Sequence, residues 1–84
     1  MGKWNKLLER VLRGTSDVSI PFDDLCGLLE RLGFESRTRG SHNIFRREGI
    51  TERPNLQRCG SHAKVYQVRQ VRDIILRYKL GDEL

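Results

Sequence analysis

The chain has 84 residues, of which 37% are hydrophobic and 32% charged, and its formal net charge at pH 7 is +5. This length allows one small domain over residues 1–84 and excludes a deep, enclosed substrate cavity. No apolar run approaches the roughly 20 residues that a membrane-spanning helix needs, so we expect no membrane partner.

The positive charge is concentrated in one part of the chain. Residues 1–33 hold five Lys and Arg side chains against five Asp and Glu, whereas residues 34–84 hold eleven against six. The excess of +5 therefore belongs entirely to the second part. A one-sided basic surface attracts polyanions such as nucleic acids, or acidic proteins, although basic surfaces also occur for solubility alone.

Two helices are predicted in the first part of the chain. Residues 3–19 predict a short amphipathic helix and a connector, because apolar residues recur at helical spacing after Trp4 until Gly14 ends the pattern. A second helix is predicted from Pro21, which suits a first helical position, to Gly33. Its apolar residues share one face: Phe22, Leu25, Leu28, Leu29 and Leu32.

From Phe34 the period of the pattern changes to two, which indicates strands. Two alternating runs, residues 34–39 and 42–47, flank a Gly-Ser pair and predict a hairpin. Residues 50–57 predict a weaker third strand, in which Pro54 fits only at an edge or a bulge. A final amphipathic helix is predicted from an apolar stripe of Val68, Val71, Ile74, Ile75 and Tyr78.

These elements predict an α+β fold, with a three-stranded antiparallel sheet and the helices packed on one of its faces. No repeat, linker or low-complexity tract divides the chain. The other face of the sheet then stays open and basic. If Phe34 and Phe45 point to the core, His42, Ile44 and Arg46 point to the open face, because side chains alternate along a strand. On that assignment Arg46 is the preferred partner of His42.

The only two histidines lie in identical Gly-Ser-His words, at residues 40–42 and 60–62. Imidazole titrates near neutral pH and can take a proton from an RNA 2′-hydroxyl, or give one to a leaving 5′-oxygen, without a metal. Cationic side chains must then stabilise charge on the phosphoryl oxygens. The candidates to bind the RNA phosphate are Arg37, Arg39, Arg46, Arg47 and Lys64.

Spacing alone leaves other interpretations of the histidines open. A histidine in a turn is most often a solvated polar residue, and the two histidines could also form one acid and base pair. Cys59 and His62 have a Cys-x-x-His spacing, but a structural zinc site needs four ligands. We therefore expect no metal and no cofactor, and the two cysteines indicate reduced thiols in a cytoplasm.

Several motifs together resemble the HicA family of bacterial toxins over residues 20–80. They are LLERLGFESRTRGSHNIFRREG, the short word NLQ, and GSHAKVYQVRQVRDIILRYKL. The resemblance implies a small fold like that of double-stranded-RNA-binding domains, in the order αβββα, with residues 3–19 as an accessory element. It also implies a ribonuclease that cleaves mRNA and a HicB-type antitoxin that blocks it.

The resemblance also implies that His42, in the first Gly-Ser-His word, is the catalytic residue and that His62 is not. The chain departs from the family pattern at Asn43, where many relatives have a second histidine or an aromatic residue. It also departs at Pro54 and Asn55, where the better-known short members have a Pro-His pair. Relatives more often have a lysine in place of His62. The alternative function is a non-catalytic RNA-binding module, which would use the same basic face.

Overall fold

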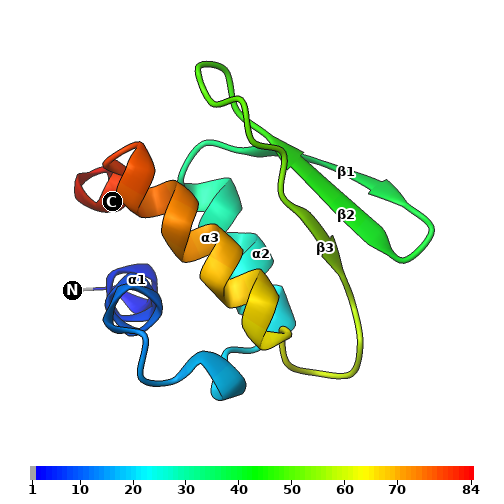
Figure 1. Ribbon diagram of the computed structural model, residues 1–84, viewed down its shortest axis with the longest axis horizontal. Coiled ribbons are helices and arrows are strands. Elements are labelled where there is room, and N and C mark those ends of the chain that lie inside the picture. Colours follow the sequence, from blue (N-terminus) through cyan, green and yellow to red (C-terminus); the bar gives the residue numbers. More distant parts are fainter. Residues whose placement is uncertain (1) are drawn as a thin grey trace.

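The computed structural model describes residues 2–84 and has an α+β fold. The elements, in chain order, are α1 (Lys3–Arg13), η1 (Asp17–Ser19), α2 (Phe22–Arg31), β1 (Glu35–Arg39), β2 (His42–Arg46), β3 (Asn55–Gln57), α3 (Val65–Arg77) and η2 (Leu80–Asp82). The strands form one antiparallel sheet in the order β1-β2-β3. Figure 1 shows the three α-helices gathered on one side of the molecule and the sheet extending on the other. The predicted fold class is confirmed.

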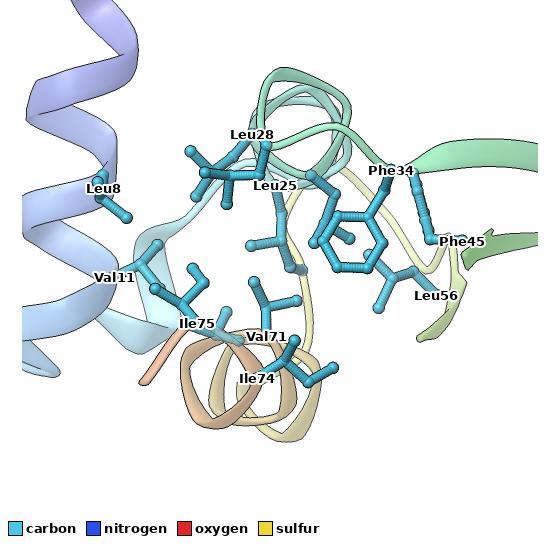
Figure 2. Close-up of a cluster of buried hydrophobic side chains, with 14 of the residues drawn as sticks. Leu8, Val11, Leu25, Leu28, Phe34, Phe45, Leu56, Val71, Ile74 and Ile75 are labelled. Atoms are coloured by element: carbon cyan, nitrogen blue, oxygen red, sulfur yellow. The ribbon is translucent and has the colours of Figure 1, made fainter. Parts of the chain in front are cut away.

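All three α-helices and the sheet contribute to one hydrophobic core. Figure 2 shows side chains from α1, α2 and α3 pointing toward one another, together with Phe34 just before β1, Phe45 of β2 and Leu56 of β3. The labelled core residues are Leu8, Val11, Leu25, Leu28, Phe34, Phe45, Leu56, Val71, Ile74 and Ile75. Because α1 buries part of this core, the accessory element packs directly on the rest of the fold.

The connector after α1 is tied to α3 by a partly buried ion pair. Arg72 donates from Nη1 to Oδ1 of Asp17 at 3.0 Å and from Nη2 to Oδ2 at 3.2 Å. The same guanidinium donates to the carbonyl of Val11 at 3.1 Å. Bidentate arginine pairs hold both partners in a fixed geometry, so residues near the end of α1 keep a defined position against α3.

The predicted apolar face of α2 is confirmed, since all five of its predicted apolar residues are buried. The helix begins at Phe22, one residue later than predicted. Pro21 is the N-cap residue and keeps an extended conformation, with φ −61° and ψ 140°. An N-cap residue lies outside the helical dihedral region, which explains the difference.

The predicted hairpin is confirmed, and its turn sets the register of the sheet. Arg39 pairs with His42 across the two-residue turn of Gly40 and Ser41. Gly40 has a φ of 59°, whereas Ser41 is not among the residues with positive φ. Glycine at the first central position is the pattern of a type II′ turn, which suits the twist of a hairpin. His42 is therefore the first residue of β2.

β3 is shorter than the predicted strand of residues 50–57, because the segment before it bonds to α3. The Tyr78 hydroxyl donates to Oε1 of Glu52 at 2.5 Å, and Arg77 donates to its Oε2 at 2.5 Å. Pro54 has no N–H for a strand ladder. Its carbonyl still accepts the N–H of Phe45 at 2.8 Å. The strand that pairs with β2 therefore begins directly after Pro54, at Asn55.

The first turn of α3 holds the end of β3. Gln67 is fully buried, and its Nε2 donates to the carbonyl of Gln57 at 3.1 Å. Its Oε1 accepts the N–H of Lys64 at 3.1 Å. The predicted apolar stripe of α3 packs on the core, with Tyr78 only partly buried. None of the helices within residues 2–84 is long and apolar enough to cross a membrane.

Candidate active site on the open face of the sheet

The strand register divides the sheet into a core face and an open face. Phe45 and Leu56 are buried, and Asn43 lies opposite Leu56 on that same face. Residues opposite one another in an antiparallel pair share a face. The pairs Arg37–Ile44 and Arg39–His42 therefore share the open face, together with Asn55 and Gln57 of β3. The predicted outward direction of His42, Ile44 and Arg46 is confirmed.

His42 has neighbours on both adjacent strands. Arg39 lies directly opposite it on β1, and Gln57 lies directly opposite on β3. The imidazole is partly buried, and its Nδ1 is 3.0 Å from Oδ1 of Asn55. Gln57 donates from Nε2 to the Ser41 hydroxyl at 3.1 Å. The turn and the ring are thus both bonded to β3, which restrains the imidazole on a rigid part of the fold.

The register brings Arg39 next to His42 and places Arg46 at the other end of β2. Arg46 pairs with Glu35 at 3.3 Å, and both side chains are largely exposed. Exposed ion pairs contribute little to the stability of a protein. The Arg46 guanidinium therefore stays accessible to a second anion. Arg37 and Arg39 form no ion pair with any of residues 2–84. Their charges are therefore uncompensated by a direct partner.

A groove of about 470 Å³ runs along this open face. Its lining comprises Glu35, Ser36, Arg37, Arg39, Ile44, Arg46 and Arg53. Arg53 lies in the segment before β3 and was not among the predicted site residues. Four arginines around one open groove form a surface suited to a polyanion.

The structure does not bring Arg47 to the open face. Its Nη1 donates to the carbonyl of Leu32 at 2.8 Å and lies 2.9 Å from the carboxylate of Glu83. Its side chain is only 26% exposed. Arg47 comes directly after β2, and its side chain lies on the same face of the sheet as Phe45. It connects the residue after α2 to the C-terminal segment through its bonds to Leu32 and Glu83.

Lys64 lies at the start of α3, away from the strands. Its Nζ is 6.0 Å from the ring of Tyr66, and its side chain is exposed. Gln67, in the first turn of α3, bonds to the carbonyl of Gln57, and Gln57 lies opposite His42 in the sheet. The start of α3 therefore packs under the end of the sheet that carries His42. Lys64 is thus an exposed cation at the start of α3, and the structure does not bring it to the imidazole.

His62 lies in a different environment from His42. It pairs with Pro21 in an isolated bridge, and its Nδ1 is 3.0 Å from the Ser61 hydroxyl. The carbonyl of Ser61 accepts the N–H of Phe22 at 2.9 Å. This second Gly-Ser-His word therefore anchors the connector to the start of α2, and the two histidines have separate partners.

Asn55 is the neighbour of His42 that the sequence analysis did not assign to the site. The alternation of Asn55, Leu56 and Gln57, with one apolar residue between two polar ones, was the available signal. It predicts that Asn55 and Gln57 share the face opposite Leu56. The hydrogen bond between Asn55 and His42 also needs the strand register, which the sequence does not show.

The two cysteines differ in their surroundings. Burial, together with the nearby carboxylates of Asp23 and Glu30, raises the pKa of the Cys26 thiol to about 11. Cys59 is exposed. A thiol with a raised pKa is a poor nucleophile, so Cys26 has a packing role. The part of the chain from residue 2 onward contains no group of three or more His, Cys, Asp or Glu residues that could hold a metal ion.

Comparison with known proteins gives no relative: no protein-family model, curated protein or solved structure matches the chain.

Proposed function

We propose that this protein is the toxin of a type II toxin–antitoxin pair, a ribonuclease of the HicA type that cleaves mRNA and is inhibited by a HicB-type antitoxin. The observation that carries the proposal is the position of His42 beside Arg39 on an open, basic sheet face. The motif resemblance described above supports the toxin role. The chemistry of imidazole and guanidinium supports phosphodiester cleavage.

In the proposed reaction the 2′-oxygen of one ribose attacks the adjacent phosphorus, and the bond from phosphorus to the next 5′-oxygen breaks. The products are a 2′,3′-cyclic phosphate and a 5′-hydroxyl. His42 takes the proton of the 2′-hydroxyl or gives one to the leaving 5′-oxygen, and water accepts or supplies the other proton. Arg39 and Arg37 stabilise the negative charge that develops on the phosphoryl oxygens. These steps need no metal ion and no cofactor.

RNA binding in this proposal depends on the arginines of the groove. Arg37, Arg39, Arg46 and Arg53 line it, and Lys64 is a further exposed cation at the start of α3. Each neutralised phosphate releases counterions, so affinity falls steeply as salt rises. We expect the affinity for RNA to fall by at least about tenfold between roughly 50 and 200 mM salt.

An antitoxin would act by covering the open face. An acidic surface complementary to the arginine groove would bury His42 and exclude RNA. We expect toxin and antitoxin to meet in the cytoplasm, where mRNA is translated and cysteines stay reduced. A saturating antitoxin that left the cleavage rate intact would contradict this mode of inhibition.

A cleavage assay tests the proposed function directly. Purified protein is incubated with mRNA in the presence of EDTA, and the ends of the fragments are identified. We expect cleavage to persist, with 2′,3′-cyclic phosphate and 5′-hydroxyl ends. Tight binding without cleavage would instead support the alternative, a non-catalytic RNA-binding module that uses the same face.

A further inference from the structure

The ring of His42 has one hydrogen-bond partner within residues 2–84, and that partner is Asn55. Oδ1 of Asn55 is 3.0 Å from Nδ1 of His42. His42 lies opposite Gln57 on β3, and Asn55 lies two residues before Gln57, so the two side chains are diagonal neighbours on the open face. This contact leaves Nε2 of the imidazole without a partner from the described chain.

The backbone on both sides of Asn55 is held in place. The carbonyl of Pro54 accepts the N–H of Phe45 at 2.8 Å. Two residues after Asn55, the carbonyl of Gln57 accepts a hydrogen bond from the buried Gln67 at 3.1 Å. Asn55 therefore projects from a strand that is fixed at both ends, and its amide is presented to the imidazole by the fold.

The chemistry of the contact defines where the proton of a neutral ring lies. An amide oxygen can only accept a hydrogen bond, so Nδ1 must carry the proton when it faces Oδ1. Neutral imidazole has one protonated nitrogen, and Nε2 then keeps its lone pair. Nε2 has no hydrogen-bond partner among residues 2–84, so its lone pair is free to accept a proton.

We propose that Asn55 is a positioning residue that holds neutral His42 in its Nδ1-protonated tautomer, so that the unprotonated Nε2 faces the RNA. The catalytic consequence rests on the proposed function, since it makes Nε2 the atom that takes the proton of the 2′-hydroxyl. The tautomer itself is independent of any activity. Arg39 from β1 and Gln57 from β3 are the other groups that face the ring.

Nitrogen spectra of the two histidines test the tautomer without RNA. Long-range proton–nitrogen correlations are recorded on ¹⁵N-labelled protein at a pH where the imidazoles are neutral. We expect the Nδ1-protonated pattern for His42 in the native chain and a shift toward the Nε2-protonated pattern in Asn55→Ala. His62 bonds to Ser61 instead, so its signals should stay unchanged in both proteins.

Gln57→Ala is the matched control for Asn55→Ala. Both residues are exposed on β3 and face the same side, but Gln57 bonds to Ser41 rather than to the ring. We expect Gln57→Ala to keep the Nδ1-protonated pattern. An Nε2-protonated His42 in the native chain would overturn the proposal, and so would a tautomer that Asn55→Ala leaves unchanged in a folded protein.

Cleavage kinetics then test the consequence of the tautomer. We expect Asn55→Ala to lower kcat about 10-fold with KM changed less than about twofold, because a ring in the wrong tautomer cannot accept the proton through Nε2. A shifted tautomer with unchanged kcat would overturn the positioning role. If the native protein cleaves no RNA, the proposed function fails, and the nitrogen spectra still decide whether Asn55 sets the tautomer.

Discussion

The two Gly-Ser-His words, residues 40–42 and 60–62, have the same sequence and different surroundings. The first forms the turn of a hairpin, and its histidine starts β2 between two neighbouring strands. The second lies in the connector before α3, and its histidine pairs with Pro21. One histidine lies opposite Arg39, which lines the arginine groove, whereas the other lies beside the start of α2.

This difference shows that the residues around a short motif, and not its sequence alone, determine the chemistry available to its histidine. Arg39 lies across from His42 because the turn fixes the register of the hairpin. No strand flanks His62 in the same way, and its ring bonds only to the adjacent Ser61 among the described residues. The comparison therefore predicts a catalytic role for His42 and not for His62, and substitutions at the two positions test this prediction.

Replacing the two histidines gives the largest expected contrast. We expect His42→Ala to lower RNA cleavage and toxicity by at least about 100-fold, the lower range for a removed general acid or base. His62→Lys should keep the activity, because position 62 needs only a positive charge, and His62→Ala should lower the activity far less than His42→Ala does. Cleavage rates, growth arrest and antitoxin binding are measured for all three variants.

The rival explanation is that both histidines act in one site. It predicts that His62→Lys is as inactive as His42→Ala while both proteins remain folded. That result would mean that the two words approach one another when RNA binds, and the proposed separation of their roles would be wrong. Unchanged amide spectra for both variants are the required control for folding.

Two arginines offer a second, smaller contrast. Arg39→Ala should lower kcat/KM about 10-fold with little change in stability, because it removes a cation beside the reacting phosphate. Arg47→Ala should lower the free energy of unfolding by about 1–3 kcal/mol, since it removes hydrogen bonds from a partly buried guanidinium. Its cleavage rate should change little at a temperature where the variant is folded.

Urea unfolding and cleavage kinetics separate these effects. If Arg47→Ala lost activity as strongly as Arg39→Ala without losing stability, Arg47 would have to reach the RNA in the complex. Arg46→Ala is an intermediate case, because Arg46 lies on the open face but pairs with Glu35 at the other end of β2. We expect it to weaken RNA binding more than it lowers kcat.

Most of the fold was predictable because local patterns and tertiary packing agree. The apolar faces of α2 and α3 are buried as predicted, and the Gly-Ser pair forms the predicted turn. The length of β3 was predicted wrongly, because hydrogen bonds from Tyr78 and Arg77 hold Glu52 outside the sheet. Such long-range contacts leave no signal in the local sequence pattern.

The site was predictable in part for the same reason. Alternation along β2 correctly placed His42 and Arg46 on the open face, whereas the assignment of Arg47 to the RNA phosphate did not follow that alternation. The preference for Arg46 as the partner of His42 did not take account of distance along the strand, since four residues span about 13 Å. The register also brings Arg39 and Asn55 to the imidazole, and register depends on pairing between strands.

The glycines of the two words allow a comparison of stability with activity. Gly40 has a φ of 59° and Gly60 a φ of 81°, and a Cβ atom at either position would have no heavy atom within 4 Å. Each Gly→Ala substitution should therefore cost about 1–2 kcal/mol through backbone strain alone. Only Gly40→Ala should also lower cleavage, because it strains the turn that carries His42. Equal losses of cleavage at equal stability would contradict this comparison.

The smallest expected effect concerns the segment that leads from β2 to β3 and so to Asn55. The hydrogen bond from the Tyr78 hydroxyl is the main cause that lowers the pKa of Glu52 below its usual value of 4.5, and Arg77 also lowers it. A carboxyl group with a lowered pKa in the folded state stabilises the fold above its unfolded pKa. This contribution is lost as the pH falls through the lowered folded pKa.

Urea unfolding at pH 6 and at pH 3 measures this contribution in the native chain and in Tyr78→Phe. Other carboxyl groups titrate equally in both proteins, so their effects cancel in the comparison. We expect the native chain to lose more stability on acidification than Tyr78→Phe does, because only the native chain has the hydroxyl that favours ionised Glu52. An identical pH dependence in the two proteins would show that the Tyr78 hydroxyl does not hold this segment.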